Sequence, residues 1–261
     1  MKLVPKNAIE LNHMRAAGQL AAQVLDYITP HVQAGVSTLK LNDLCHAYIE
    51  EHNAVPAPLN YKGYPKATCI SVNDVVCHGI PSADEILKDG DILNIDVTVI
   101  LNGYHGDTSR MYTVGKVDDA AMQLIRTTYD SMMAGINTVK SGSYLYDIGN
   151  AIEKVVAPKG YGIVRDYCGH GLGRTFHEDP MVLHYANREF AGVRLRNGVT
   201  FTVEPMVNAG SFRTELLDDG WTVLTADRKL SAQFEHTLAV SDNGPEIMTL
   251  SPAGYTLPPY A

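Results

Sequence analysis

The chain has 261 residues, of which 45% are hydrophobic and 19% are charged, and its formal net charge is −8. This size and composition are typical of a globular protein with a sizeable core, in one large domain or two, and they exclude a disordered chain. The negative charge and the lack of a Lys/Arg-rich run disfavour nucleic acid as the main partner.

Two helices are predicted within the first fifty residues. Asn7-Ala8-Ile9-Glu10 has the pattern of a capping box that opens a helix. Apolar residues continue at helical spacing to Ile28, and the segment from Pro30 to Gly35 ends this helix. A second helix follows, with Leu41 and Ile49 on one face.

The cysteines and the N-terminal residues indicate the compartment. Cys45, Cys69, Cys77 and Cys168 form no CxxC pair and no disulfide framework, so free thiols in a reducing compartment are expected. No apolar stretch approaches a signal peptide or a membrane span. We therefore expect a cytoplasmic protein that does not bind a membrane.

After a proline-rich loop, strands are predicted from Thr68 to Thr113, and an acid lies on the polar face of one of them. In the segment from Gly90 to Ile100, Asp96 shares a strand face with Asn94 and Thr98, and apolar residues take the other face. Such a polar face usually meets water, and a solvated face is one interpretation here.

The dipeptide Asn102-Gly103 is a strong signal for a two-residue hairpin turn. With these as loop residues, position 98 faces 107 and position 96 faces 109. Asp96 and Asp107 then lie on one face as diagonal neighbours, with backbones roughly 7–8 Å apart. This spacing suits one or two metal ions, although a β-bulge would change the register.

The order of elements restarts near Asp118. Two helices are predicted, one through Met122 and Met133 and one through Tyr146 and Val155, and strands follow from Gly160. The two halves contain short similar segments: GDILNID resembles NGVTFTVE, and His78-Gly-Ile-Pro resembles His177-Glu-Asp-Pro. We predict a single domain over 1–261 made of two αβ halves, about 5–115 and 118–250, with a site between them. Chance similarity of short strings is the alternative.

Acids also lie on polar faces of predicted strands in the second half. Glu204 follows Thr200 and Thr202, and Glu235 alternates with Gln233 and Thr237. Four clustered carboxylates would repel one another unless cations held them, so these acids predict a metal site.

The ten histidines differ in their surroundings. Glycines flank His170 in the segment CGHGLGR, which lets the chain turn tightly and expose the imidazole, unless the loop contains a histidine by chance. His78 and His177 each precede a proline by three residues, where extended segments are expected to end, and we expect both to face a cleft. Six others are expected to be surface or structural residues: His13, His31, His46, His52, His184 and His236.

Five motifs of this chain resemble those of the bacterial type I methionine aminopeptidases, in order and over nearly the whole chain: NDVVCHGIP, NIDVTVILNGYHGDTSR, CGHGLGRTFHEDP, TVEPM and SAQFEHT. The resemblance implies an α+β pita-bread (creatinase/aminopeptidase-like) fold, with two pseudo-symmetric halves around a curved antiparallel sheet and a dinuclear metal site between them. The helical insertion and the cysteine-rich N-terminal extension of other classes have no counterpart here.

The resemblance also implies the metal ligands. The five ligands of the family correspond to Asp96, Asp107, His170, Glu204 and Glu235, the set identified above on chemical grounds. Asp107 and Glu235 would bridge two divalent ions, Asp96 would bind one ion, and His170 and Glu204 would complete the other. This set tolerates Co, Mn, Fe and Zn and does not select among them.

The implied reaction is removal of the N-terminal methionine from peptides and nascent proteins whose second residue is small. Glu204 would act as general base, His177 would stabilise the oxyanion and His78 would lie near the leaving amine. The methionine pocket corresponds to Tyr61, Tyr64, Cys69, Phe176 and Trp221 with His78, each of which could instead be a core residue.

Other implications concern the pocket rim, a further ion and the partners. Pro58 stands where the family commonly has a cysteine. A monovalent cation, Na⁺ or K⁺, would bind at Asn73, Val75 and Ser231. The expected partners are peptides with N-terminal Met and nascent polypeptides, with docking on the ribosome left open, and the expected state is a monomer.

Two alternatives to this function are kept. An X-Pro aminopeptidase or prolidase shares the ligands, but such enzymes usually carry an extra N-terminal domain and lack the CHGIP-type segment. A catalytically inactive binding module of the same fold is less consistent with a complete set of ligands.

Overall fold

The computed structural model describes residues 2–260 and contains four α-helices in the predicted places. They are α1 (Ala8–Ile28), α2 (Thr38–Glu51), α3 (Asp119–Ile136) and α4 (Leu145–Val156). Short 3₁₀ helices are η1 (Thr29–His31), η2 (Tyr61–Gly63), η3 (Ala157–Lys159) and η4 (Arg188–Phe190). The predicted capping box is confirmed, because the side chain of Asn7 accepts from the N–H of Glu10 and the Glu10 carboxylate accepts from the N–H of Asn7. No helix in this range is long and apolar enough to cross a bilayer.

Residues 2–260 also contain fifteen β-strands. In the first half they are β1 (Val55–Pro56), β2 (Cys69–Val72), β3 (Val75–Cys77), β4 (Ile92–Leu101) and β5 (Tyr104–Thr113). In the second half they are β6 (Gly162–Ile163), β7 (Gly169–Gly171), β8 (Glu178–Val182), β9 (Thr200–Val203), β10 (Met206–Asn208), β11 (Thr214–Leu216), β12 (Val223–Thr225), β13 (Ser231–Gln233), β14 (Glu235–Ser241) and β15 (Gly244–Ile247). The segment predicted as a proline-rich loop contains β1, which pairs with β4.

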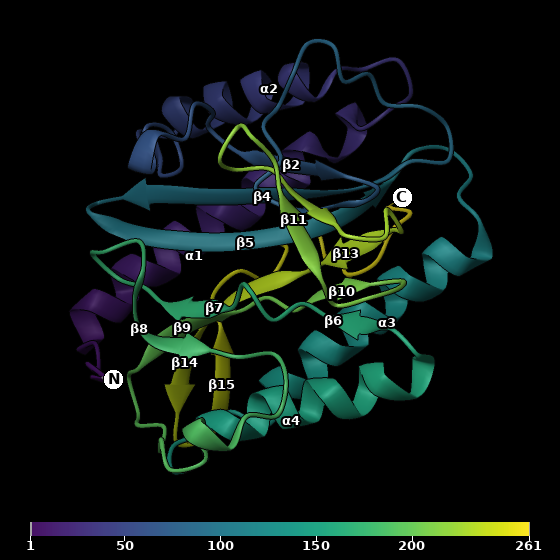
Figure 1. Ribbon diagram of the computed structural model, residues 1–261. Helices are drawn as coiled ribbons and strands as arrows, with labels where there is room; N and C mark the ends of the chain where they lie inside the picture. The colour runs from purple at the N-terminus through teal and green to yellow at the C-terminus, as the bar shows by residue number, and fades with distance from the viewer. Residues whose placement is uncertain (1, 261) are drawn as a thin grey trace.

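The main sheet has nine antiparallel strands in the order β1-β4-β5-β14-β9-β7-β8, with β2 on β4 and β15 on β14. Two three-stranded sheets, β13-β10-β6 and β11-β12-β3, complete the strand layer. In Figure 1, α1 and α2 cover the β4–β5 side of this layer, and α3 and α4 lie on the opposite side of the molecule. Strands of both halves therefore meet in the middle, where β5 pairs with β14.

The β4–β5 hairpin has the predicted register. Thr98 pairs with Asp107 and Asp96 pairs with Ser109, without a bulge along the ten pairs. Asn102 and Gly103 both have positive φ, 53° and 77°, as a type I′ turn requires. The polar face of this hairpin is buried, so the interpretation as a solvated face was wrong.

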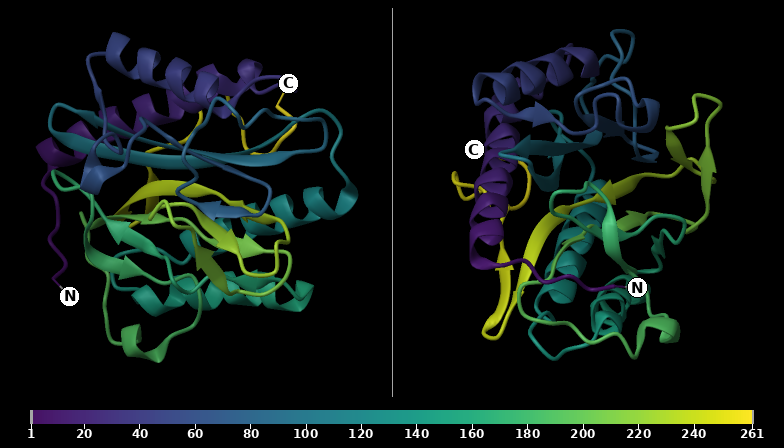
Figure 2. Two further views of the ribbon diagram at one scale, coloured as in Figure 1. Left: turned by 45° about the horizontal axis from the view of Figure 1, so that its top comes forward. Right: turned by 90° about the vertical axis from the view of Figure 1, so that its left-hand side faces the viewer.

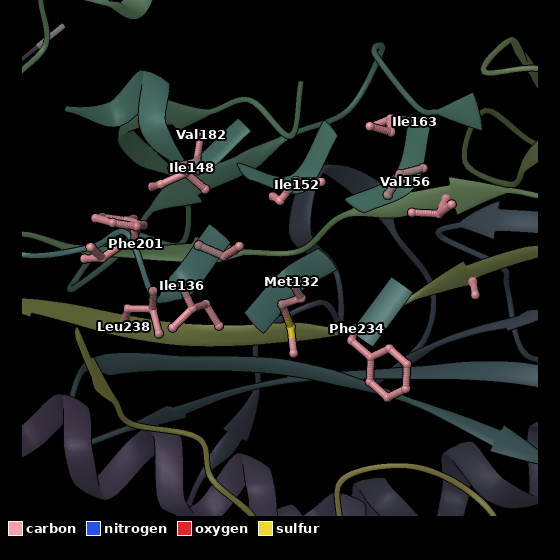
Figure 3. Close-up of a cluster of buried hydrophobic side chains, with 14 of the residues drawn as sticks. Met132, Ile136, Ile148, Ile152, Val156, Ile163, Val182, Phe201, Phe234 and Leu238 are labelled. Atoms are coloured by element: carbon pink, nitrogen blue, oxygen red, sulfur yellow. The ribbon is translucent and has the colours of Figure 1, made fainter. Parts of the chain in front are cut away.

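Each half buries its own apolar core between helices and strands. The second-half core packs α3 and α4 against β9 and β14 and includes Met132, Ile136, Ile148, Ile152, Phe201, Phe234 and Leu238 (Figure 3). The first-half core packs α1 and α2 against β2, β4 and β5. At Gly106 in β5 an added Cβ would lie 2.3 Å from the backbone of Ala17, so this position must be glycine for α1 to approach the sheet.

Candidate metal centre and substrate cavity

A cavity of about 630 Å³ opens where the two halves meet. Its lining contains all five predicted metal ligands and every residue of the predicted methionine pocket. It therefore brings together residues more than 170 positions apart in the chain: Tyr61, Tyr64, Cys69, His78, Asp96, Asp107, His170, Phe176, His177, Glu204, Trp221 and Glu235.

Sheet register positions the acids. Asp96 in β4 pairs with Ser109 in β5, and Ser109 pairs with Glu235, the first residue of β14. Asp107, two residues before Ser109, projects from the same face of β5 as Ser109. Glu204 was predicted within a strand, but it follows β9, which ends at Val203.

Ligand atoms of Asp107, His170 and Glu235 lie within 4.8 Å of one another. Nε2 of His170 is 3.5 Å from Oδ2 of Asp107 and 3.8 Å from Oε1 of Glu204. Oδ1 of Asp96 is buried and has no hydrogen-bond partner among residues 2–260. Carboxylate oxygens and one imidazole thus converge with spare coordinating capacity, which fits divalent cations.

Neighbouring side chains orient two of the acids. The hydroxyl of Thr98 donates to Oδ1 of Asp107 at 2.7 Å, which leaves Oδ2 toward His170. The hydroxyl of Thr202 donates to Oε1 of Glu204 at 2.7 Å, and the amide of Gln233 contacts its other oxygen at 3.3 Å. The polar residues that share strand faces with the acids therefore hold the carboxylates in place.

The electrostatics of the cluster favour cation binding. Burial raises the pKa of Asp96 and of Glu235 well above the ordinary value, and neighbouring carboxylates raise both further. Burial also raises the pKa of Glu204 to about 7, although His170 opposes this shift. Burial disfavours the charged form of His170, but Asp107 and Glu204 outweigh it and raise its pKa. The raised pKa values of the acids reflect in part the repulsion among the carboxylates. A bound cation would offset this repulsion.

His177 and His78 face the same cavity. Nδ1 of His177 is 2.9 Å from the hydroxyl of Tyr61, and its ring centre is 4.1 Å from that of His170. Burial, reinforced by His170, lowers the pKa of His177 to about 4. His78 follows β3, as expected, whereas His177 precedes β8, so the prediction that both end extended segments was wrong for His177.

Aromatic side chains line one end of the cavity, where Phe176 also contacts the rings of His170 and His177. Tyr64 is buried, its hydroxyl contacts the carbonyls of Thr68 and Gly79, and its ring meets the edge of Trp221 at 5.1 Å. The rings of Tyr61 and Phe176 are 4.8 Å apart. Cys69 is buried opposite Asp96 in the sheet, and Pro58 is a buried residue that also lines the cavity. This end is apolar and suits an unbranched thioether side chain.

The residues of the predicted monovalent-cation site lie on neighbouring elements. The N–H of Ser231 donates to the carbonyl of Asn73 at 2.9 Å, and Val75 begins β3 two residues later. The structure thus brings Asn73 and Ser231 together, and cation binding there stays a prediction.

His184 is a buried structural residue, which agrees with its expected grouping, but nothing in the sequence indicates its contact with Glu204. Its side chain is buried, and Nε2 accepts the backbone N–H of Glu204 at 3.1 Å. Burial lowers the pKa of His184 to about 3, so the ring is neutral and can accept. It lies two residues beyond β8 and twenty before Glu204, and no spacing in the sequence links the two positions.

Comparisons with known proteins show which family the chain resembles. The sequence profile described as metallopeptidase family M24 matches residues 12–242. The chain is 58% identical to a methionine aminopeptidase of Rickettsia prowazekii over 248 residues, 95% of each chain. It is 54% identical to one of Escherichia coli K12 over 251 residues, 96% of this chain and 95% of that one.

Solved structures show the same likeness. The crystal structure of the methionine aminopeptidase from Rickettsia prowazekii has a TM-score of 0.92 and 55% identity, covering 95% of this chain and all of that one. An Xaa-Pro dipeptidase from Bacillus anthracis has a TM-score of 0.75 at 20% identity, and 62% of its length is covered. The second likeness shows a shared fold, the pita-bread fold predicted from the motifs.

Proposed function

Because this chain belongs to metallopeptidase family M24, and within it to the bacterial methionine aminopeptidases, we propose that it removes N-terminal methionine from peptides and nascent proteins with a small second residue. It is a metallo-aminopeptidase and thus a hydrolase. The observation that carries the proposal is one cavity lined both by buried acids with an imidazole and by an apolar aromatic pocket.

Two divalent cations would be held by Asp96, Asp107, His170, Glu204 and Glu235. When bound, such cations polarise a carbonyl and make water acidic near neutral pH. We propose Co, Mn, Fe or Zn as the metal, since oxygen and imidazole ligands accept each of them.

Glu204 is the proposed general base, which takes the proton of the attacking water. Thr202 and Gln233 fix its carboxylate, and His184 fixes its backbone, so the base is held in one orientation. A base held in place avoids the entropic cost of finding its position during the reaction.

His177 is proposed to stabilise the oxyanion. The hydroxyl of Tyr61 can donate to Nδ1, which leaves the proton on Nε2 as a donor for the carbonyl oxygen of the substrate. A pKa of about 4 keeps this ring neutral at physiological pH. The ring of His78 makes T-shaped contacts with those of Tyr167 and Trp221, and His78 is proposed to contact the leaving amine.

Further proposals concern the pocket, a second kind of ion and the organisation of the chain. Tyr61, Tyr64, Cys69, Phe176 and Trp221, with His78 and His177, would bind the substrate, and Asn73, Val75 and Ser231 would bind Na⁺ or K⁺. The carbonyl of Asn73 lies beside Ser231, which supports such a site.

We also propose that the protein is a cytoplasmic monomer. Its single domain would consist of two halves, about 5–115 and 118–250.

The test compares kcat/KM for Met-Ala-Ser with values for Met-Lys-Ser, Met-Phe-Ser and Ala-Pro-Ala, before and after removal of metal by a chelator. We expect Met-Ala-Ser to be preferred, chelation to abolish activity, and Co²⁺ or Mn²⁺ to restore it. Full activity in metal-free protein would refute a metal-dependent reaction. Faster cleavage of Ala-Pro-Ala would indicate an X-Pro aminopeptidase instead.

A further inference from the structure

The loop that carries His177 lies at an edge of the main sheet. β8 is the terminal strand in the order β9-β7-β8, and its register with β7 shifts between His170 and Gly171. An edge strand with an irregular ladder has few backbone hydrogen bonds to hold it. The position of His177, directly before β8, therefore depends on contacts from other parts of the chain.

One set of such contacts comes from the segment before α1. This segment runs from the start of α1 toward the strands of the second half (Figure 2, right). The ammonium of Lys6 pairs with the carboxylate of Glu178, the residue after His177. The backbone N–H of Lys2 donates to Asp179 at 2.7 Å. The N-terminal segment thus binds both residues that follow His177.

The ion pair of Lys6 with Glu178 is largely buried, unlike a solvent-exposed surface pair. Only 9% of the Lys6 side chain and 29% of the Glu178 side chain are exposed. The backbone N–H of Lys6 donates to the carbonyl of Gly198 at 2.8 Å. A Cβ at Gly173 would lie 2.6 Å from Cε of Lys6, so this glycine leaves the space that the lysine stem occupies. A desolvated pair of this kind contributes more than an exposed one.

A second set of contacts fixes the start of the same loop. The backbone N–H of His105 donates to the carbonyl of Gly173 at 2.9 Å, and the His105 ring stacks on Phe176 at 5.4 Å. His105 thus holds the loop before His177, and Lys6 holds the strand after it. Both ties come from the first half of the chain, whereas His177 belongs to the second.

We propose that Lys6 is a positioning residue, which holds His177 at the reacting carbonyl through its ion pair with Glu178. This inference rests on the proposed aminopeptidase activity for its kinetic consequence, but the structural tie can be measured without it. Loss of the pair leaves Glu178 without its partner and frees the first residues of β8. His177 then shifts or samples several positions, and misplacement by about 1 Å can cost on the order of 10²-fold in rate.

The chain offers a matched control. Arg15, on the same helix that the N-terminal segment precedes, pairs with Glu246 of β15, with one N–O distance of 2.9 Å. This pair also joins α1 to the second half, but neither residue lines the cavity. A general loss of cohesion between the halves would affect both pairs alike. Of the two pairs, only that of Lys6 with Glu178 contacts the segment that carries His177.

The experiment compares wild type, Lys6→Met, Lys6→Arg and Arg15→Met by amide hydrogen exchange and by kinetics on Met-Ala-Ser. In Lys6→Met we expect faster exchange over residues 172–180 and a kcat at least roughly 10-fold lower, with bound metal unchanged. Lys6→Arg keeps the charge and should retain most of kcat. Arg15→Met should match wild type in kcat and in exchange over 172–180. If Lys6→Met fails to fold, Glu178→Gln removes the same pair with almost no change in shape.

The outcomes separate this inference from the proposed function. Wild-type exchange and kcat in Lys6→Met would overturn the positioning role, as would equal losses in Lys6→Met and Arg15→Met. A wild-type protein that does not cleave Met-Ala-Ser would refute the proposed function. The exchange comparison would then still decide whether Lys6 holds the segment that carries His177.

Discussion

The two ends of the cavity are built from different kinds of structure. At the metal end, Asp96, Asp107, His170 and Glu235 lie within strands of one sheet, so hydrogen-bonded ladders fix their relative positions. At the substrate end, Tyr61 lies in a short 3₁₀ helix, and Phe176 and Trp221 lie in connections between strands. Strand ladders therefore fix these four ligands, whereas contacts between distant segments place Tyr61, Phe176 and Trp221. Cys69 joins the two ends, because it lies in β2 and pairs with Asp96.

This difference predicts two separable effects of substitution. Changes at the metal end should alter metal affinity together with rate, whereas changes at the substrate end should alter rate or KM and leave metal binding intact. Substitutions at four positions and one change of conditions test this separation, from the largest expected effect to the smallest.

Replacement of Glu204 by Gln should have the largest effect, because Glu204 is both the proposed base and a proposed ligand. We expect the rate to fall by roughly 10²–10⁴-fold, the range for loss of a general base. Calorimetric titration of metal-free protein should also show weaker binding of Mn²⁺. A wild-type rate and a wild-type affinity for Mn²⁺ in this variant would show that Glu204 is neither the base nor a metal ligand.

Replacement of His177 by Ala should lower kcat by about 10²–10³-fold, the usual cost of losing one oxyanion donor. Bound metal should remain at the wild-type level, since Nδ1 of His177 contacts Tyr61 and its lowered pKa reflects burial. Metal analysis after dialysis checks this. Loss of metal from this variant would show that His177 contributes to metal binding and belongs to the metal end.

His184 tests the metal end without touching a ligand side chain. His184→Leu removes the acceptor of the Glu204 N–H and should weaken metal binding by about 10–100-fold, as loss of a residue that orients a ligand does. His184→Gln places an oxygen near the position of Nε2 and should recover most of this loss. Equal affinities in the two variants would show that the hydrogen bond to Glu204 has no such effect.

Trp221 tests the substrate end. Its ring makes T-shaped contacts with the rings of Tyr64 and His78, and Trp221→Ala opens the apolar end of the cavity. We expect kcat/KM for Met-Ala-Ser to fall about 10-fold, the scale of changes in an apolar specificity pocket. The Mn²⁺ titration should coincide with that of wild type, and a shifted titration would contradict the separation of the two ends.

Removal of metal should reduce stability in a pH-dependent way. The raised pKa values of Asp96, Glu204 and Glu235 mean that the folded metal-free protein holds protons that the unfolded chain has released. Its stability should therefore fall as the pH rises through the pKa of Glu204, from about 7 to 8, and the raised pKa of His170 acts in the same direction. We expect the unfolding temperature to drop by a few degrees, on the order of 1 kcal/mol. Mn²⁺ should abolish this drop, and a drop of equal size with Mn²⁺ present would assign it to other groups.

The sequence by itself determined the local parts of this molecule. Alternation and helical spacing located the four helices and the main strands, and Asn102-Gly103 fixed the register that places Asp96 near Asp107. These features depend on residues close in the chain, whose geometry follows from backbone preferences and the periods of strand and helix. The aromatic pocket residues came from resemblance to a family, because their spacing carries no such period.

Only the tertiary structure decided which faces and loops meet. The alternation of polar and apolar residues places Glu204 and Glu235 on polar faces of their segments. It does not show which other strand pairs with each segment. The contact of His184 with Glu204, the pair of Lys6 with Glu178 and the contact of Tyr61 with His177 join positions 20, 172 and 116 residues apart. Such contacts arise when the halves pack their separate cores and close the sheet between β5 and β14, and no local pattern in the sequence encodes that closure.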